Sequence, residues 1–165
     1  MRLASDEGAV VDLRPLRFQF GSSLEPRDWD ANWLYITAQV ELSDGRSWSF
    51  SDPCLTTWEA RELGSWLQGV LAESVQPAAY GGEMDENLLV FTEPNLAFSL
   101  ASRDDGSATI RVHFSLESLP PWLRGNTDAE RPDIFDFFVE VQLARSALAE
   151  AAASWGREIL AFPVR

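Results

Sequence analysis

The sequence predicts an α+β fold, in which an antiparallel sheet of about six or seven strands and two amphipathic helices form two layers. Three observations lead to this prediction. Several segments alternate apolar and polar residues, short turn sequences join them into hairpins, and two segments repeat apolar residues at helical spacing. No long linker or internal repeat interrupts the 165 residues. We therefore expect a single domain over residues 1–165, with residues 1–8 frayed.

The clearest predicted strand is Trp33–Leu42, whose apolar residues lie on one face and whose polar and aromatic residues lie on the other. A hairpin partner, Arg46–Phe50, follows an Asp-Gly turn, in which Gly adopts the positive φ that a tight turn needs. Ser107–Glu117 alternates equally well and places His113 on the outward face. Weaker patterns add four further strands: Val10–Phe20, Asn87–Thr92, Leu96–Ser102 and Phe135–Leu143.

Two segments are expected to be helical. Pro53 should end the second strand of the hairpin, and Thr56 and Glu59 then have the spacing of a capping box. In that motif each of the two side chains bonds a backbone N–H that the first helical turn leaves unpaired. Apolar residues recur at helical spacing up to Leu71. A second amphipathic helix of about 17 residues should end before Pro163.

Charge and cysteine content narrow the class of protein. The formal net charge of −13 disfavours a nucleic acid or an anionic membrane as partner, because both would repel the chain. The same charge suits a basic partner, although it would also serve solubility alone. Cys54 is the only cysteine, which excludes an internal disulfide and a cysteine-based metal cluster. Without the apolar core of a signal peptide, we expect a soluble cytoplasmic protein.

No motif in the sequence predicts catalysis. His113 is the only histidine and has no partner at metal-binding spacing, and no Gly-x-Ser-x-Gly elbow could present a serine to it. Cys54 has no base indicated nearby. We therefore expect no enzyme, no catalytic residue, no cofactor and no metal. Four acidic pairs fall in predicted loops or turns: Asp28/Asp30, Asp85/Glu86, Asp104/Asp105 and Asp128/Glu130. We interpret them as solvated turn residues. A metal-dependent hydrolase built on these carboxylates is a distant alternative.

Two strings in the first half of the chain are distinctive, namely D-x-NWL at Asp30–Leu34 and DPCLTxWE at Asp52–Glu59. Together with Trp48 and Trp66, over residues 16–72, they resemble the WapI-type immunity proteins. These are cytoplasmic bacterial proteins that neutralise a wall-associated toxin whose C-terminal domain is a nuclease acting on tRNA. The resemblance implies an immunity protein whose partner is a cognate toxin domain. The matched residues themselves suit structural roles at a turn and at a strand-to-helix corner.

An inhibitor of this type would place carboxylates where the nuclease binds substrate phosphates, and would accept charge-assisted hydrogen bonds from toxin Arg and Lys. The candidate partner-binding residues are loop carboxylates and aromatic anchors: Asp28, Trp29, Asp30, Asp104, Asp105, Trp122, Asp128 and Glu130. The alternative is a small-ligand-binding or housekeeping α+β domain, which would contain an enclosed apolar pocket. The sequence leaves homo-oligomerisation open.

Overall fold

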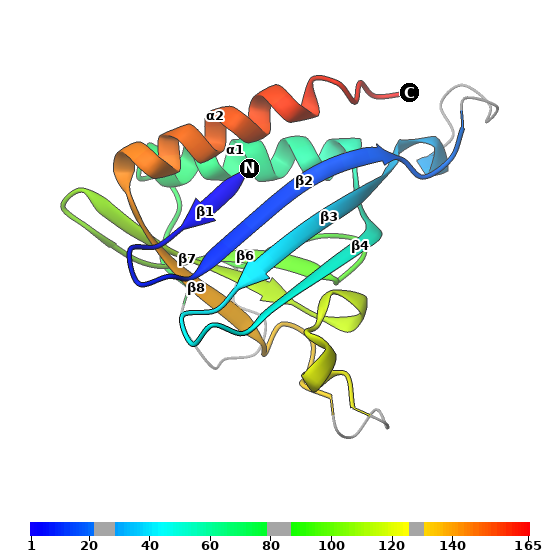
Figure 1. The fold of residues 1–165 in the computed structure, drawn as a ribbon. Helices are drawn as coiled ribbons and strands as arrows, with labels where there is room; N and C mark the ends of the chain where they lie inside the picture. Colours follow the sequence, from blue (N-terminus) through cyan, green and yellow to red (C-terminus); the bar gives the residue numbers. More distant parts are fainter. Residues whose placement is uncertain (22–28, 79–86, 126–130) are drawn as a thin grey trace.

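The computed structural model describes residues 1–21, 29–78, 87–125 and 131–165. These residues form eight strands and two α-helices, and the strands divide equally between two antiparallel sheets (Figure 1). The predicted α+β class and the two helices are confirmed. The predicted sheet of six or seven strands is wrong, because alternation shows which face of a strand is buried but not which strands lie beside it.

Each sheet contains four strands in chain order and is followed by a helix. The first comprises β1 (Arg2–Ala4), β2 (Val10–Phe18), β3 (Trp33–Glu41) and β4 (Ser47–Thr56), with the 3-10 helix η1 (Trp29–Asn32) before β3 and α1 (Thr57–Leu71) after β4. The second comprises β5 (Leu89–Val90), β6 (Leu96–Asp104), β7 (Ser107–Phe114) and β8 (Phe138–Ala144). The 3-10 helices η2 (Leu116–Ser118) and η3 (Pro121–Leu123) precede β8, and α2 (Arg145–Ile159) follows it.

The apolar core lies between the sheets and against both helices. In Figure 1 the first sheet lies in front of the second, while α1 and α2 run side by side along one edge of both. Trp155 of α2 is fully buried, and its indole N–H donates to the Ala60 carbonyl of α1 over 2.7 Å. Gly64 lies against this ring, and a Cβ there would be 3.4 Å from Trp155 Cδ1, an ordinary van der Waals contact. The two helices therefore meet through a tryptophan and a glycine.

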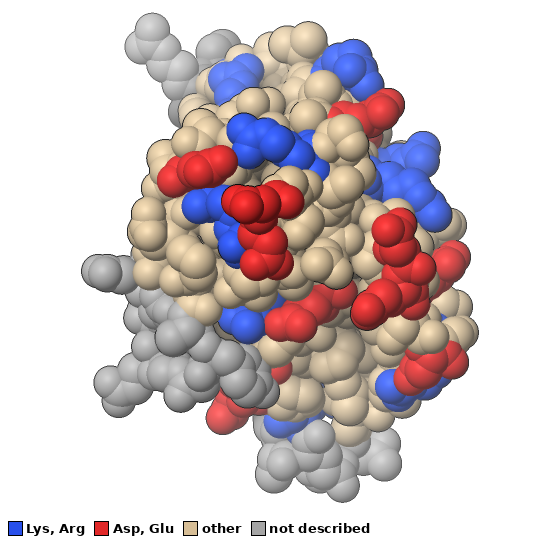
Figure 2. Space-filling view, turned by 90° about the vertical axis from the view of Figure 1, so that its left-hand side faces the viewer, with Lys and Arg blue, Asp and Glu red and all other residues tan. Residues whose placement is uncertain are grey.

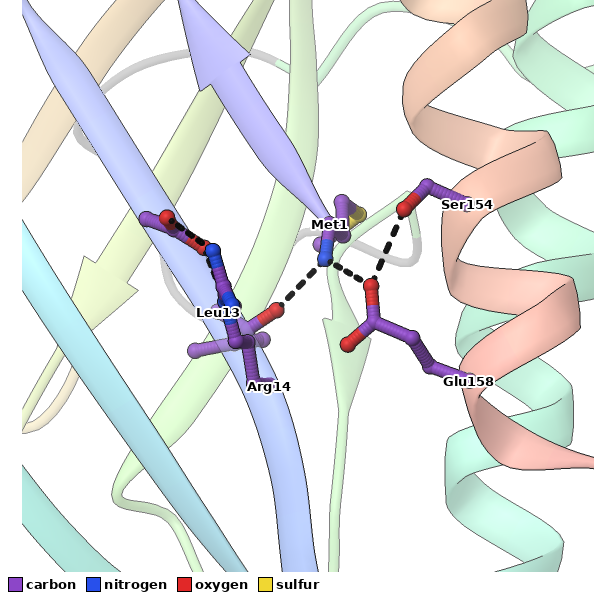
Figure 3. Close-up of polar contacts among 6 residues, drawn as sticks. Met1, Leu13, Arg14, Ser154 and Glu158 are labelled. Atoms are coloured by element: carbon purple, nitrogen blue, oxygen red, sulfur yellow. Dashed lines mark hydrogen bonds and ion pairs between the residues drawn. The ribbon is translucent and has the colours of Figure 1, made fainter. Parts of the chain in front are cut away.

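The start of the chain, expected to be frayed, belongs to the first sheet. Arg2–Ala4 pairs with β2, and the Met1 side chain is buried. The Met1 ammonium donates to the Leu13 carbonyl over 2.8 Å and pairs with a Glu158 carboxylate oxygen of α2 at 2.6 Å (Figure 3). Ser154 donates to the same oxygen over 2.9 Å. These contacts tie the beginning of the chain to its last helix.

Three strands begin or end at residues clearly different from those predicted. β4 continues through Pro53 to Thr56, which an edge strand tolerates because the missing N–H of proline interrupts no ladder bond. β7 ends at Phe114, before Leu116 adopts a φ of +53°. β8 begins only at Phe138, since Phe135 has a φ of +72°. Positive φ is incompatible with a strand, and side-chain alternation does not reveal it.

Candidate functional site

The corner between β4 and α1 is fixed by the capping box that the sequence predicts. The Glu59 carboxylate accepts from the Thr56 N–H over 2.7 Å, and the Thr56 hydroxyl accepts from the Glu59 N–H over 3.3 Å. The second oxygen of Glu59 accepts from the Thr92 N–H over 2.7 Å. This buried glutamate therefore also attaches the segment between β5 and β6 to the start of α1.

Asn32, in the other distinctive string, is fully buried and joins three segments. Its amide oxygen accepts from the Thr57 hydroxyl and from the Arg165 N–H, both over 2.9 Å. Its amide nitrogen donates to the Arg165 backbone oxygen over 3.2 Å. The end of η1, the start of α1 and the C-terminal segment are thereby held together, in agreement with the structural role expected for Asn32.

This framework presents two stacked tryptophans on the surface. Trp29 of η1 and Trp58 of α1 have ring centroids 4.8 Å apart and an interplanar angle of 25°. Trp29 remains 54% exposed and Trp58 38% exposed. Stacking covers only one face of each ring, so a large aromatic surface stays accessible. Surfaces of this kind suit protein interfaces.

Beside the tryptophan pair lies a hollow of about 600 Å³, here called the acidic groove. Its lining comes from η1, β3, β4 and the segments after β2, before β6 and after β7. The described residues of the lining include four carboxylates and two tryptophans, with no arginine among them: Gln19, Phe20, Trp29, Asp30, Trp33, Asp52, Pro53, Glu93, Asn95 and Glu117. The groove therefore combines aromatic walls with a concentration of negative charge.

The carboxylates of the acidic groove act on one another. Burial raises the pKa of Asp52 above its ordinary value, and the charges of Glu117 and Glu93 raise it further. Within the described part of the chain, no arginine forms an ion pair with Asp52 or Glu93. Glu117 accepts one long hydrogen bond of 3.4 Å from the Asn95 amide. A cation entering the groove would relieve this repulsion.

Only two of the predicted partner-binding residues, Trp29 and Asp30, line the acidic groove. Asp104 ends β6 and Asp105 follows it in the β6–β7 turn, and both line a separate hollow of about 530 Å³ at the C-terminal end of α1. That hollow also contains Arg103 and Arg145. Figure 2 views the molecule from the side of this turn and shows acidic and arginine side chains interspersed. Carboxylates and guanidinium groups therefore lie together in this hollow.

Trp122, on η3, is 40% exposed. Its described ring contacts are with Trp48 and Arg46 and not with Trp29. Its ring meets the edge of the buried Trp48 at 5.7 Å between centroids, and the Arg46 guanidinium lies 5.1 Å from the ring centroid. Trp122 thus covers the core beside β4. The remaining predicted residues lie outside the described segments: Asp28, Asp128 and Glu130.

Sequence reasoning missed most of the acidic groove. Asp52 occurs in one of the two distinctive strings, where it was interpreted as structural. Glu93 and Glu117 carry no signal of their own, because they come from separate loops that only the fold brings together. The available clue was the presence of tryptophans in strings otherwise explained by caps and turns.

His113 does not have the partly exposed position expected for an outward-facing strand residue. It is only 7% exposed, because the rings of Phe135 and Phe138 pack against that face of β7. Its Nδ1–H donates to the Phe135 carbonyl over 2.7 Å, and Nε2 accepts from the Ser99 hydroxyl over 2.9 Å. Burial lowers the pKa of His113. The buried Ser99 hydroxyl offers no access to a substrate.

Other reactive groups are equally enclosed or dispersed. Cys54 is fully buried, and burial raises the pKa of its thiol well above the ordinary value. Within the four described segments, no group of three or more His, Cys, Asp or Glu side chains is placed to hold a metal ion. The arrangement that can attract a ligand is thus the acidic groove with its tryptophans.

Comparison with known proteins identifies one family. A family model described as "Immunity protein WapI-like family" matches residues 2–163, well beyond the segment 16–72 that carries the two strings. A search of curated proteins finds no match. Neither α-helix in the described segments has the length and apolar character needed to cross a membrane.

Proposed function

Since the chain belongs to the WapI-like immunity protein family, we propose that it neutralises a cognate nuclease toxin by binding it through an acidic surface. Family membership supports an immunity role and, in general, a toxin as partner. The observation that carries the finer proposal is the acidic groove, where four carboxylates lie beside an exposed tryptophan pair. Hollows with charged linings of this kind differ from the apolar pockets that bind small ligands.

Inhibition would follow from occupation of the nuclease's own substrate site. A nuclease attracts phosphates with Arg and Lys side chains, and carboxylates placed there accept charge-assisted hydrogen bonds from the same groups. The net charge of −13 also accelerates association with a basic domain. Blocking the site requires no reaction, so the proposed role is non-enzymatic. It would be exercised in the cytoplasm, where an RNA substrate is exposed to the toxin.

The test is co-expression of this chain with a nuclease toxin domain encoded in the same genome. We expect cells that produce the toxin to grow when this chain is co-expressed, and the two proteins to co-elute on a sizing column. An unrelated acidic protein of similar size and charge serves as the control and should not rescue growth.

Two results would contradict the proposal at different levels. Absence of both rescue and complex formation would refute the immunity role for this toxin. Rescue from a toxin that leaves tRNA and other nucleic acids intact in vitro would retain the immunity role and refute the nuclease partner.

A further inference from the structure

The acidic groove brings together exposed aromatic surface and carboxylates from distant segments. Trp29 is more than half exposed, and Trp33 is half-buried beside it. Asp52 projects from β4, while Glu93 and Glu117 come from the loops that flank β6 and β7. The bond from the Thr92 N–H to Glu59 keeps the Glu93 loop next to α1. The groove is thus a built feature of the fold rather than a run of acidic residues in one loop.

We propose that the acidic groove receives an arginine side chain of the partner, with its guanidinium against the Trp29 indole and its N–H groups bonded to the carboxylates of Asp52, Glu93 and Glu117. This inference rests on the proposed function, since it assigns the contact surface and the chemistry of the partner residue. A guanidinium suits both components of the groove. It stacks on aromatic faces and presents five donors in a planar fork.

The occupant is a side-chain cation rather than a metal ion. No three acidic groups in the described segments converge closely enough to hold a metal, whereas the hollow of about 600 Å³ has room for a long side chain. The chain uses the same pairing internally. The Arg17 guanidinium lies 3.8 Å from the Tyr35 ring centroid, and that of Arg165 lies 3.4 Å from the Phe18 ring centroid.

A positive charge from another molecule would balance the carboxylates of Asp52, Glu93 and Glu117. Among the described residues that line the groove, none is an arginine, and the sequence contains no lysine. A second copy of this chain would approach with its own net charge of −13, and a nucleic acid would approach with phosphates. Both would be repelled by four carboxylates, so a basic protein surface is the partner that this chemistry fits.

Binding of the peptide octa-arginine to the full chain tests the proposal without the toxin. The test variant combines Asp52→Asn, Glu93→Gln and Glu117→Gln, which remove charge but keep side-chain size. The matched control combines Glu41→Gln, Glu62→Gln and Glu150→Gln, which remove the same number of charges from exposed residues outside the groove. We expect the groove variant to bind at least about tenfold more weakly than wild type, and the control to differ by less than about twofold.

Two further measurements locate the contact. In NMR spectra, octa-arginine should shift the indole N–H signals of Trp29 and Trp58 ahead of that of the buried Trp155. Trp29→Ala should weaken binding of octa-arginine more than binding of octa-lysine, because a guanidinium gains more from the aromatic face. Melting temperatures verify that each variant folds, and neutralising groups that repel one another should not lower them.

The proposal is overturned if the groove variant and the control bind octa-arginine equally well, or if Trp29→Ala affects both peptides equally. Growth rescue distinguishes failure of this docking assignment from failure of the proposed immunity function. A groove variant that protects cells as well as wild type removes the docking assignment and leaves the immunity role standing. Wild type that fails to protect removes the immunity role, while the peptide measurements still decide whether the groove binds arginine.

Discussion

At the scale of single residues, the strings typical of the family contain two kinds of side chain. Asn32 and Glu59 are buried and bond to backbone groups of distant segments. Trp58 and Asp52 lie at the surface, where they form part of the tryptophan pair and of the acidic groove. The same short segments therefore build the scaffold and furnish the surface that it presents, which explains why a purely structural interpretation of them was incomplete.

His113 should make the stability of the protein depend on pH. Burial lowers its pKa in the folded state, an effect to which Arg111 adds and which the bond to the Phe135 carbonyl opposes. The unfolded chain therefore binds a proton more readily than the folded chain. The contribution of His113 to the free energy of unfolding is fully present above the ordinary histidine pKa of about 6.5. It is lost as the pH falls from that value through the lower pKa of the folded state, with a slope of at most about 1.4 kcal/mol per pH unit.

Urea unfolding of wild type and of His113→Gln between about pH 7.5 and 5.5 measures this effect, because carboxyl groups with ordinary pKa values near 4 titrate mostly below that range. The glutamine amide can donate to the Phe135 carbonyl and accept from Ser99, so the variant keeps the bonds without the titration. As the pH decreases, we expect the free energy of unfolding to fall more steeply for wild type than for His113→Gln. Equal slopes for the two proteins would show that His113 is not the titrating group.

At the scale of elements, the contacts of Glu59 predict a large effect on α1. Glu59→Ala removes the acceptor of two backbone N–H groups, those of Thr56 and Thr92. Since an unsatisfied buried donor costs about 1–3 kcal/mol, we expect a loss of about 2–4 kcal/mol in the free energy of unfolding. Thr56→Ala removes a single cap acceptor and should cost about 1 kcal/mol. Chemical denaturation of the purified variants measures both losses.

Glu62→Ala is the matched control, because Glu62 is an exposed glutamate of the same helix. Its substitution should change the free energy of unfolding by less than about 0.5 kcal/mol. If Glu59→Ala costs no more than Glu62→Ala, the two buried bonds do not contribute to stability, and the loop that carries Glu93 must be held by other contacts.

The elements could be predicted from sequence where local physics determines them. Alternation identified β3 and β7, and the spacing of Thr56 and Glu59 identified the start of α1. β1 was missed because a strand of three residues in a polar segment offers no alternation to detect, and its position depends on contacts with β2 and α2. The acidic groove was missed for the same reason, since its carboxylates meet only through tertiary contacts.

At the scale of the whole molecule, the order of elements suggests two folding units, whereas the packing indicates one. Each sheet of four strands is followed by its own helix, an arrangement that would permit two separate folding units. The core instead contains buried residues from both sheets and both helices. Bonds also connect the ends of the chain to distant elements, from Met1 to Glu158 and from Asn32 to Arg165. We therefore propose that residues 1–165 form a single domain.

A single domain should unfold in one transition, because neither sheet can keep its apolar face buried once the other is lost. In urea, tryptophan fluorescence and far-UV circular dichroism should give coincident curves with a slope of about 1–3 kcal/mol per M. Trp48→Phe removes the reporter of the first sheet, and Trp155→Phe removes the reporter of the helix pair. Comparing each variant with wild type therefore isolates the signal of the tryptophan that was replaced, and both variants should again show coincident transitions. Two midpoints, with the signal of Trp48 changing apart from that of Trp155, would show instead that each sheet unfolds with its own helix.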